Sequence, residues 1–327
     1  MANVSYGKKV SKIFIDTKLN NKSFKIQNAA KKLSLLSNLK QQICFICGSK
    51  NNQKEISFYN TQYVKCKRCT HVFTNRRLSD SNLNKFYVND ITYSSTFANK
   101  KILKMRENLV RPKLAFIKKY VKGKKWLDVG SADGSAISVL SQDGFNCYGI
   151  EVSKNSREFA KKYRKLDLYP NTLETFYKEN KKKFDTVSFF GVLEHLSDPI
   201  RALQISNKIL KNDGIVAMTV PNYNSLSTYV QSLEKYTDRH LVPYSHIMLF
   251  TKKSIEYALK KTGFKSIAIW CWGMDVIELL KYFRIKNKNF KNSKLEKILI
   301  EKLNDIQFIF DKDLLGDEFL VVARKIK

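Results

Sequence analysis

The sequence contains no apolar run that approaches the ~20 residues a helix needs to cross a bilayer. Residues 1–24 carry lysines but lack the continuous apolar stretch of a secretory signal peptide. We therefore expect a cytoplasmic protein. The hydrophobic content of 43% over 327 residues excludes a wholly disordered chain, because it suffices for a sizeable core.

Arginine is scarce for so basic a chain. Only 11 of the 60 basic residues are arginine, although the net charge is +31. Because recognition of bases and phosphates favours arginine, this composition resembles a general lysine bias more than a nucleic-acid groove. The charge still indicates anionic partners, whether phosphorylated small molecules, acidic lipid surfaces or RNA.

Glycine is sparse as well, and its placement matters most in one turn. The stretch KKWLDVGSADGS (124–135) ends a short apolar run in a turn that contains Gly130 and Gly134. A strand, a glycine-containing turn and a helix in this order typically approach a nucleotide-like ligand. A dinucleotide fingerprint would have glycine in place of Ala132 and Ser135, so the turn alone is a weak signal.

The six cysteines contain one pattern. Two C-x2-C pairs, separated by 18 residues, are formed by Cys44 and Cys47 and by Cys66 and Cys69. This spacing is typical of a four-thiolate zinc site, the alternative being four unrelated reduced cysteines. Each pair closes a tight knuckle, and Gly48 permits the turn of the first. Because four thiolates leave no open coordination position, the predicted zinc is structural.

Strand-like and helix-like patterns alternate from residue 124 onward, which predicts an α/β fold with a doubly wound sheet. The expected strands are 125–130, 146–153, one within 183–196, 215–222, 264–272 and 318–326. We divide the chain into a basic segment (1–40, with a short helix near 28–39), a zinc-ribbon-like module with its linker (41–98) and a sheet domain (99–327). Residues 273–316 form a helical, basic insertion in the sheet domain.

Acidic side chains near the glycine turn indicate the type of ligand. Glu151, at the end of the second expected strand, can accept hydrogen bonds from both hydroxyls of a ribose. This favours NAD or S-adenosylmethionine (SAM) over a solvent-exposed glutamate of no function. Asp128 lies beside the turn, where its charge suits the ammonium and sulfonium of SAM better than a pyrophosphate.

Five ordered segments resemble the motifs of class I SAM-dependent methyltransferases. They are LDVGSADGS, YGIEVS, FDTVSFFGVLEHLSDP, LKNDGIVAMTVPN and HIMLFTKKSIEYALKKTGF, within roughly 115–325. The branch with LEH after the fourth strand includes quinone O-methyltransferases and many sugar or natural-product enzymes. The cysteine segment also resembles the zinc-bearing N-terminus of bacterial members associated with surface-polysaccharide or nucleotide-sugar methylation. The resemblance implies a Rossmann-like sheet of seven strands preceded by a small zinc-ribbon-like module.

The resemblance also implies a set of cofactor contacts. The backbone of Gly130 and Gly134 would hold the methionine end of SAM, Glu151 its ribose, Thr172 and Leu173 its adenine, and the Phe190 carbonyl its ammonium group. The sequence departs from the family at Ala132, where glycine is usual. A methyl group is tolerable there if the backbone angle is ordinary.

Methyl transfer requires alignment, and also a base when the acceptor is a hydroxyl or a carbon acid. His195 follows the fourth strand and is a candidate base or acceptor contact, the alternative being a structural role in capping the helix near Asp198. His246, in an expected lid after the fifth strand, is a second candidate. Glu194 shares the position of His195, or packs and orients the loop.

We therefore expect a SAM-dependent methyltransferase acting on a small phosphate-bearing acceptor, such as a nucleotide sugar or an envelope glycan precursor. An RNA methyltransferase is one alternative, although no Asn/Asp-Pro-Pro-Tyr motif follows the fourth strand. A non-catalytic zinc-ribbon binding protein with a vestigial SAM domain is the other. Contact with a membrane surface is compatible with the charge. The aromatic stretches 86–97 and 222–230 either close over an acceptor or pack the module against the core.

Overall fold

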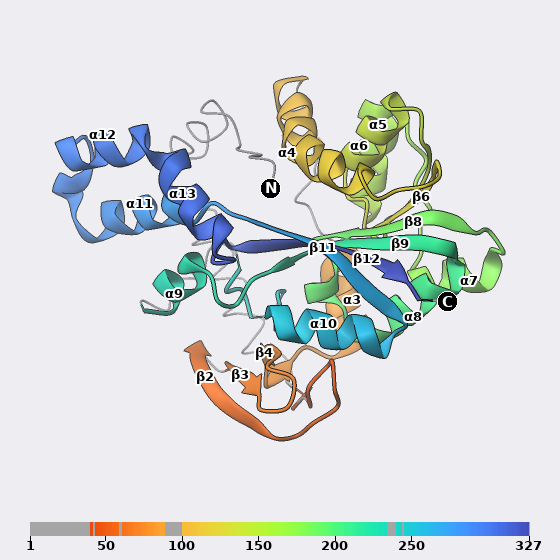
Figure 1. The fold of residues 1–327 in the computed structure, drawn as a ribbon, viewed down its shortest axis with the longest axis horizontal. Coiled ribbons are helices and arrows are strands. Elements are labelled where there is room, and N and C mark those ends of the chain that lie inside the picture. The colour runs from red at the N-terminus through yellow and green to blue at the C-terminus, as the bar shows by residue number, and fades with distance from the viewer. Residues whose placement is uncertain are drawn as a thin grey trace.

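The computed structural model describes residues 40–41, 43–58, 61–88, 100–233, 240–243 and 245–326, so the expected helix near 28–39 lies outside the described residues. Its centre is a six-stranded sheet of order β11-β12-β9-β8-β6-β7 (Figure 1). The strands are β6 Lys125–Val129, β7 Asn146–Ile150, β8 Phe184–Phe190, β9 Leu210–Pro221, β11 Phe264–Trp272 and β12 Glu318–Lys325. No helix in these ranges is long and apolar enough to span a membrane.

The sheet is parallel except for one strand. Strands β7, β6, β8 and β9 pair in parallel, whereas β12 runs antiparallel to both β9 and β11. The resemblance implied seven strands, but the sheet of the described residues has six, because beyond β7 the chain forms only a single parallel bridge between Ile150 and Tyr169. The predicted doubly wound α/β fold is confirmed, and the carboxyl ends of its parallel strands meet at one edge.

Helices cover both faces of this sheet, as Figure 1 shows. On one face lie α4 Lys100–Lys118, α5 Ser135–Gln142 and α6 Lys154–Arg164, and on the other α7 Leu173–Glu179, α8 Pro199–Ile209 and α10 Lys252–Lys261. Neighbouring side chains of β6 serve the two faces, because side chains alternate along a strand. Trp126 packs with Leu114 and Ile117 of α4, while Leu127 belongs to the core cluster of the opposite face.

The N-terminal module is built into the rest of the chain through a second sheet. Its strands β2 Asn52–Phe58, β3 Thr61–Cys66 and β4 Val72–Thr74 continue into β10 Met248–Leu249, which follows β9 in the chain. A two-residue pair, β1 Lys40–Gln41 and β5 Arg76–Arg77, and helix α3 Asp80–Val88 complete the module. The expectation of a lid after the fifth strand is thus wrong for residues 247–249, because these residues are buried and β10 pairs with β4.

The expected insertion is helical. It contains α11 Asp275–Lys286, η3 Lys288–Phe290, α12 Lys294–Glu301 and α13 Leu303–Lys312, and α11 contacts α9 Leu226–Leu233. These helices enclose a small core of their own, formed by Val276, Ile277, Leu280, Phe290 and Leu303. The insertion therefore has a packed interior separate from the two faces of the central sheet.

Candidate active site and cysteine cluster

The turn after β6 is fastened to the end of β7. The backbone N–H groups of Gly130 and Ser131 both donate to the carbonyl of Ile150, at 2.8 and 2.9 Å. Gly130, Ala132 and Gly134 have φ values of 73°, 49° and 74°. The condition under which alanine is tolerable at position 132, an ordinary backbone angle, is therefore not met, because Ala132 occupies the left-handed region that favours glycine.

Substitution of Ala132 by glycine should stabilise the protein. A left-handed L-residue costs about 1–2 kcal/mol, and the greater freedom of glycine in the unfolded chain offsets part of the gain. We expect the free energy of unfolding to rise by about 1 kcal/mol, measured by urea denaturation. The matched change Ala136→Gly, inside α5, should lower it by about 1 kcal/mol. A destabilised Ala132→Gly variant would contradict this account of the turn.

Glu151 supports the same turn from the end of β7. One carboxylate oxygen accepts from the Ala132 N–H at 2.8 Å, and the other from the Ser153 N–H at 2.7 Å. The residue is only 8% exposed, so it is not the solvent-exposed glutamate of the alternative interpretation. An ionised carboxylate only accepts hydrogen bonds and has about four lone-pair positions, a chemistry that suits the hydroxyls of a ligand.

Asp128 lies one residue before the last position of β6, beneath the turn. Its carboxylate accepts from the Ser188 hydroxyl at 2.6 Å, and that hydroxyl in turn accepts from the Trp126 indole N–H at 2.8 Å. Burial raises the pKa of Asp128 to about 7, opposed by the Ser188 contact. A contact of Asp128 with a cationic ligand remains a prediction.

A buried ion-pair network near the turn was missed by the sequence analysis. Asp133 accepts from the backbone and the hydroxyl of Ser135, and it pairs with Arg164 at 3.0 Å and with Arg106 at 3.3 Å. Arg164 also pairs with Glu107 of α4 at 2.5 Å. The network therefore holds α4 and α6 against the turn. An aspartate immediately before a helix N-terminus was the available signal.

The other expected cofactor positions lie at the start of α7 and at the end of β8. Thr172 is exposed and caps α7 by accepting from the Thr175 N–H, and Leu173 is buried. Phe190 ends β8 and is half-buried. Their roles toward adenine and the ammonium group stay predictions.

The structure brings together the three side chains proposed for catalysis. Glu194, His195 and His246 each place one nitrogen or oxygen atom within 4.8 Å of the others. The first two lie in η2 Leu193–His195, directly after β8, and His246 lies just before β10. The imidazole rings of the two histidines are 4.7 Å apart between centroids. Two imidazoles and a carboxyl group form a donor set that can hold and pass a proton, and it also suits a divalent cation.

Backbone carbonyls fix the tautomers of both imidazoles. His195 Nδ1 lies 2.8 Å from the Ser245 carbonyl, and His246 Nδ1 lies 3.1 Å from the His240 carbonyl. Because a carbonyl only accepts, each Nδ1 carries the proton and each Nε2 carries the lone pair. Tyr87, which the sequence placed only in an aromatic stretch, reaches His195 from α3: its hydroxyl is 2.7 Å from Nδ1 and donates to the Ser245 carbonyl at 3.0 Å.

The environment of Glu194 differs from that of the histidines. The side chain is buried, and burial raises its pKa to about 8, so it is mainly protonated at neutral pH. Asp198 caps α8 without His195, by accepting from the Arg201 N–H at 2.8 Å. The capping role considered for His195 is therefore filled by Asp198 alone.

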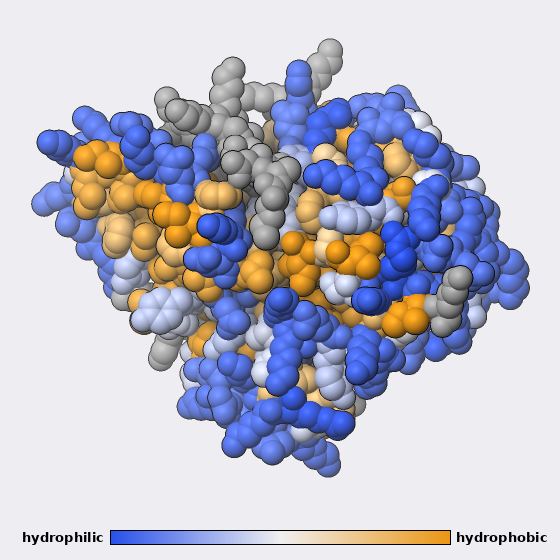
Figure 2. Space-filling model, viewed as in Figure 1, coloured by the Kyte–Doolittle hydropathy of each residue, from blue (hydrophilic) through white to orange (hydrophobic). Residues whose placement is uncertain are grey.

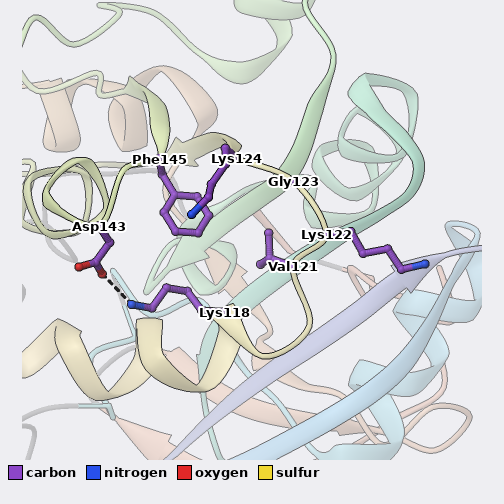
Figure 3. Close-up of a pocket in the computed structure, with 7 residues that line it drawn as sticks. All are labelled: Lys118, Val121, Lys122, Gly123, Lys124, Asp143 and Phe145. Atoms are coloured by element: carbon purple, nitrogen blue, oxygen red, sulfur yellow. Dashed lines mark hydrogen bonds and ion pairs between the residues drawn. The ribbon is translucent and has the colours of Figure 1, made fainter.

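A separate cavity of about 430 Å³ lies at the opposite edge of the sheet, before β6 begins (Figure 3). Lysines that line this cavity already interact with other side chains of the protein. Lys118 pairs with Asp143 at 2.6 Å, and the Lys124 ammonium lies over the Phe145 ring at 4.3 Å. This cavity is remote from the carboxyl edge of the sheet, along which the turn after β6 and the histidines both lie, so we do not assign it to the site.

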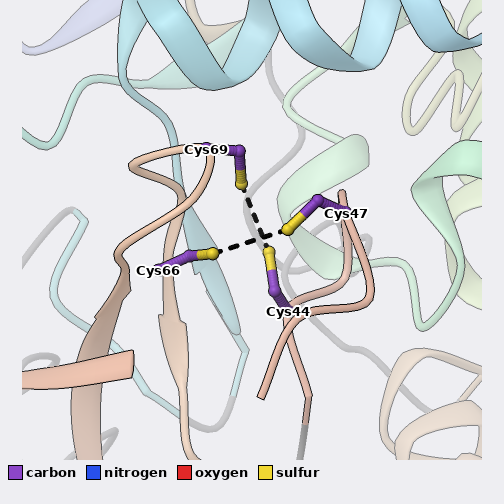
Figure 4. Close-up of side chains that lie close together, drawn as sticks. All are labelled: Cys44, Cys47, Cys66 and Cys69. Carbon is purple, nitrogen blue, oxygen red and sulfur yellow. Dashed lines mark hydrogen bonds between the residues drawn. The ribbon is translucent and has the colours of Figure 1, made fainter. Parts of the chain in front are cut away.

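Four cysteine side chains converge in the N-terminal module (Figure 4). The Cys44 and Cys69 sulfurs are 3.4 Å apart, and the Cys47 and Cys66 sulfurs are 3.5 Å apart. The residue after each pair has a left-handed backbone, Gly48 as the sequence indicates and Thr70 as it does not. The two C-x2-C pairs therefore form equivalent knuckles that direct all four sulfurs to one point.

Both knuckles dock on α10 and its cap. The Lys261 ammonium donates to the Ile46 carbonyl at 3.0 Å, and the hydroxyls of Thr70 and Thr251 are 2.7 Å apart. Elsewhere in the module, the Tyr63 hydroxyl donates to the His246 carbonyl at 2.7 Å. The cysteine module thus contacts the histidine cluster through its own side chains.

The methyltransferase domain family matches residues 102–269. Similar curated proteins include the ubiquinone biosynthesis O-methyltransferases of Actinobacillus pleuropneumoniae serotype 7 (29% identical over 117 residues, 33% of this chain and 50% of the relative) and of Pelagibacter ubique (31% over 134 residues, 38% and 54%). The chain thus spans about half the length of the curated relatives it matches.

Solved structures that resemble this chain include two methyltransferases. One is a SAM-dependent methyltransferase from Archaeoglobus fulgidus, with 17% identity, a TM-score of 0.46, and coverage of 69% of this chain and 100% of the other. The second is the magnesium protoporphyrin IX methyltransferase of Synechocystis PCC 6803 with bound S-adenosylhomocysteine, with 13% identity, a TM-score of 0.47, and coverage of 76% and 100%. Because the family match takes in just over half of the residues, the chain belongs to the methyltransferase domain family.

Proposed function

We propose that this chain transfers a methyl group from SAM to a hydroxyl of a small, phosphate-bearing acceptor such as a nucleotide sugar or an envelope glycan precursor. The assignment of SAM as the cofactor rests on the Glu151 carboxylate. It is buried at the end of β7 and accepts a hydrogen bond from the Ala132 N–H of the turn after β6. Membership of the methyltransferase domain family supports the same cofactor.

The residues of the turn fit an adenosyl cofactor. Glu151 is acceptor-only when ionised, which suits the two hydroxyls of a ribose. Gly130 and Gly134 have left-handed backbone angles, and a Cβ at either position would collide with Val192 or Leu166, so the turn requires glycine at both. Bound SAM supplies the activated methyl group, and the chain supplies position and proton transfer.

His195 is the base in this proposal. Its Nε2 takes the proton of the acceptor hydroxyl, while the Ser245 carbonyl and the Tyr87 hydroxyl hold the ring through Nδ1. His246 lies beside it with the same tautomer, so it can contact the acceptor or relay the proton. A hydroxyl acceptor agrees with the names of the O-methyltransferase relatives, and an anionic one agrees with the net charge of +31.

We also propose that the four cysteines hold a structural zinc ion. Tetrahedral coordination with Zn–S bonds near 2.3 Å places sulfurs about 3.8 Å apart, close to the spacing of the cluster. The donor set is complete with four thiolates, so the ion would fix the fold of the module and take no part in methyl transfer.

The cofactor assignment is tested by calorimetric titration of S-adenosylhomocysteine. We expect a dissociation constant in the ~micromolar range for the wild type, about −8 kcal/mol. Glu151→Gln should weaken binding by about 10- to 100-fold, because hydrogen bonds to a charged group contribute about 1.5–3 kcal/mol. Glu158→Gln, an exposed glutamate of α6, is the matched control and should bind normally. Absence of binding to the wild type would overturn the proposal.

The acceptor is tested separately, with SAM labelled in its methyl group and a panel of nucleotide sugars beside phenolic acceptors that lack phosphate. Transfer to a nucleotide sugar supports the proposed class. Transfer to the phenols alone would retain the enzyme and exclude this acceptor. Saturable transfer to RNA that outcompetes both would favour the alternative of an RNA methyltransferase.

A further inference from the structure

The helical insertion exposes an unusual number of apolar side chains. Of the ten large hydrophobic residues that are exposed in the described part of the chain, six lie between residues 285 and 315. They are Ile285, Leu295, Ile298, Phe308, Ile309 and Leu315. The insertion already has its own buried core, so these side chains are additional to the ones that stabilise it. We call them the apolar patch.

Figure 2 shows where the apolar patch lies. In this view apolar side chains gather over α11, α12 and α13, and hydrophilic side chains surround them. Leu295 and Ile298 are three residues apart on α12, so they project from the same side of that helix, and they are 57% and 46% exposed. Phe308 and Ile309 extend the exposed surface onto α13, at 47% and 59%.

The border of the apolar patch is basic along α11 and α12, whereas at α13 it includes the exposed carboxylates Asp305 and Asp313 as well as Lys312. Residues 281–302 contain eight basic side chains and two acidic ones. Of the two acidic residues, Glu296 is buried and pairs with Arg284, and Glu301 pairs with Lys302 at 3.2 Å. The exposed lysines of this range are Lys286, Lys288, Lys291, Lys294, Lys297 and Lys302.

We infer that the apolar patch and its lysines form a docking surface for a bilayer that contains anionic phospholipid. Such a surface offers headgroup charge to the lysines and an acyl boundary to the apolar side chains at the same time. A nucleic acid would satisfy only the lysines. A second copy of this chain would bring the same positive border against itself, which charge repulsion opposes. The inference is independent of the proposed methyl transfer.

Vesicle flotation of the whole 327-residue chain tests this inference. Vesicles of phosphatidylcholine alone are compared with vesicles of equal parts phosphatidylcholine and phosphatidylglycerol, at low and at high salt. We expect flotation with the mixed vesicles only, and weaker flotation at high salt, because salt screens exposed charges. Absence of flotation with mixed vesicles at low salt would overturn the inference.

Two pairs of variants separate the apolar and the basic parts. Lys294→Gln with Lys297→Gln should weaken partitioning roughly 25-fold, since each lysine near an anionic surface contributes about fivefold. The control, Lys252→Gln with Lys253→Gln on α10, removes the same charge elsewhere and should have little effect. Equal losses in both double variants would indicate general attraction by net charge and contradict a defined surface.

Ile298→Ser with Phe308→Ser should weaken partitioning at least tenfold, whereas Ile326→Ser, an exposed isoleucine outside the insertion, should not. Unchanged flotation of the Ile298/Phe308 variant would overturn the role of the apolar patch. Light scattering without vesicles provides a further check: a wild-type dimer that this double variant abolishes would assign the patch to self-association instead. Urea denaturation, compared with that of the wild type, reports whether each variant is folded.

Discussion

His195→Gln should lower kcat by about 10²- to 10⁴-fold, the usual contribution of a positioned general base. Its affinity for S-adenosylhomocysteine should not change, because Glu151 and the turn after β6 lie elsewhere along the carboxyl edge. Glutamine has a similar reach but cannot accept the proton of the acceptor and become charged. We assign the role of base to His195 because its Nδ1 lies 2.8 Å from the Ser245 carbonyl and 2.7 Å from the Tyr87 hydroxyl. These contacts leave Nε2 as the basic atom.

Steady-state kinetics with the acceptor found in the labelling assay would measure this effect. Ser245→Ala is the control: the carbonyl that orients His195 belongs to its backbone and is retained, so kcat should stay near that of the wild type. Tyr87→Phe should lower kcat by about tenfold with little change in KM, because it removes one of two groups that orient the ring. Wild-type kcat in His195→Gln would exclude the base, and a parallel loss of cofactor affinity would indicate a structural role instead.

Cys66→Ser should abolish stoichiometric zinc and unfold the N-terminal module. Binding of structural zinc in small domains contributes about 10–16 kcal/mol, and this free energy is coupled to folding because the unfolded chain has no formed site. The effect should extend to methyl transfer, because Tyr87 reaches His195 from this module and β4 pairs with β10 two residues after His246. We expect zinc near one ion per chain in the wild type and well below that in the variant.

Metal analysis, hydrogen exchange over residues 43–77 and the labelling assay would measure the three parts of this result. Cys147→Ser is the control, because Cys147 lies on β7 outside the cluster and should leave the zinc content unchanged. A wild-type protein purified without zinc, and equally stable after chelation, would contradict a structural metal site. Loss of zinc with full activity would retain the site but remove its link to the histidines.

The sequence predicts those features whose determinants are close together along the chain. Alternating strand and helix patterns locate the central sheet, and the spacing of the cysteines locates their cluster, because each depends on a short segment. His195 and His246 were both identified, each from its position after a strand. The sequence does not predict that these two side chains lie close together, because their proximity depends on how residues 245–250 pack against the N-terminal module.

Contacts between segments far apart in the sequence cannot be predicted from local patterns. Tyr87 and His195 are 108 residues apart, and no periodicity or spacing links them. The left-handed backbone at Ala132 was also missed, because alanine gives no signal for it. There the tertiary hydrogen bond from the Ala132 N–H to Glu151 outweighs the local preference.

The pairing of β4 with β10 has a consequence for the order in which the protein folds during synthesis. Residues 72–73 pair with β3 on one side, but they cannot pair with 248–249 on the other side until the chain has been made as far as residue 249. The two knuckles are complete much earlier, by Thr70, so the cysteines can be gathered while the outer edge of β4 still lacks its partner. Closing so long a loop is slow compared with forming local structure. The N-terminal module is therefore begun before the central sheet is made and is completed only after β10 has been made.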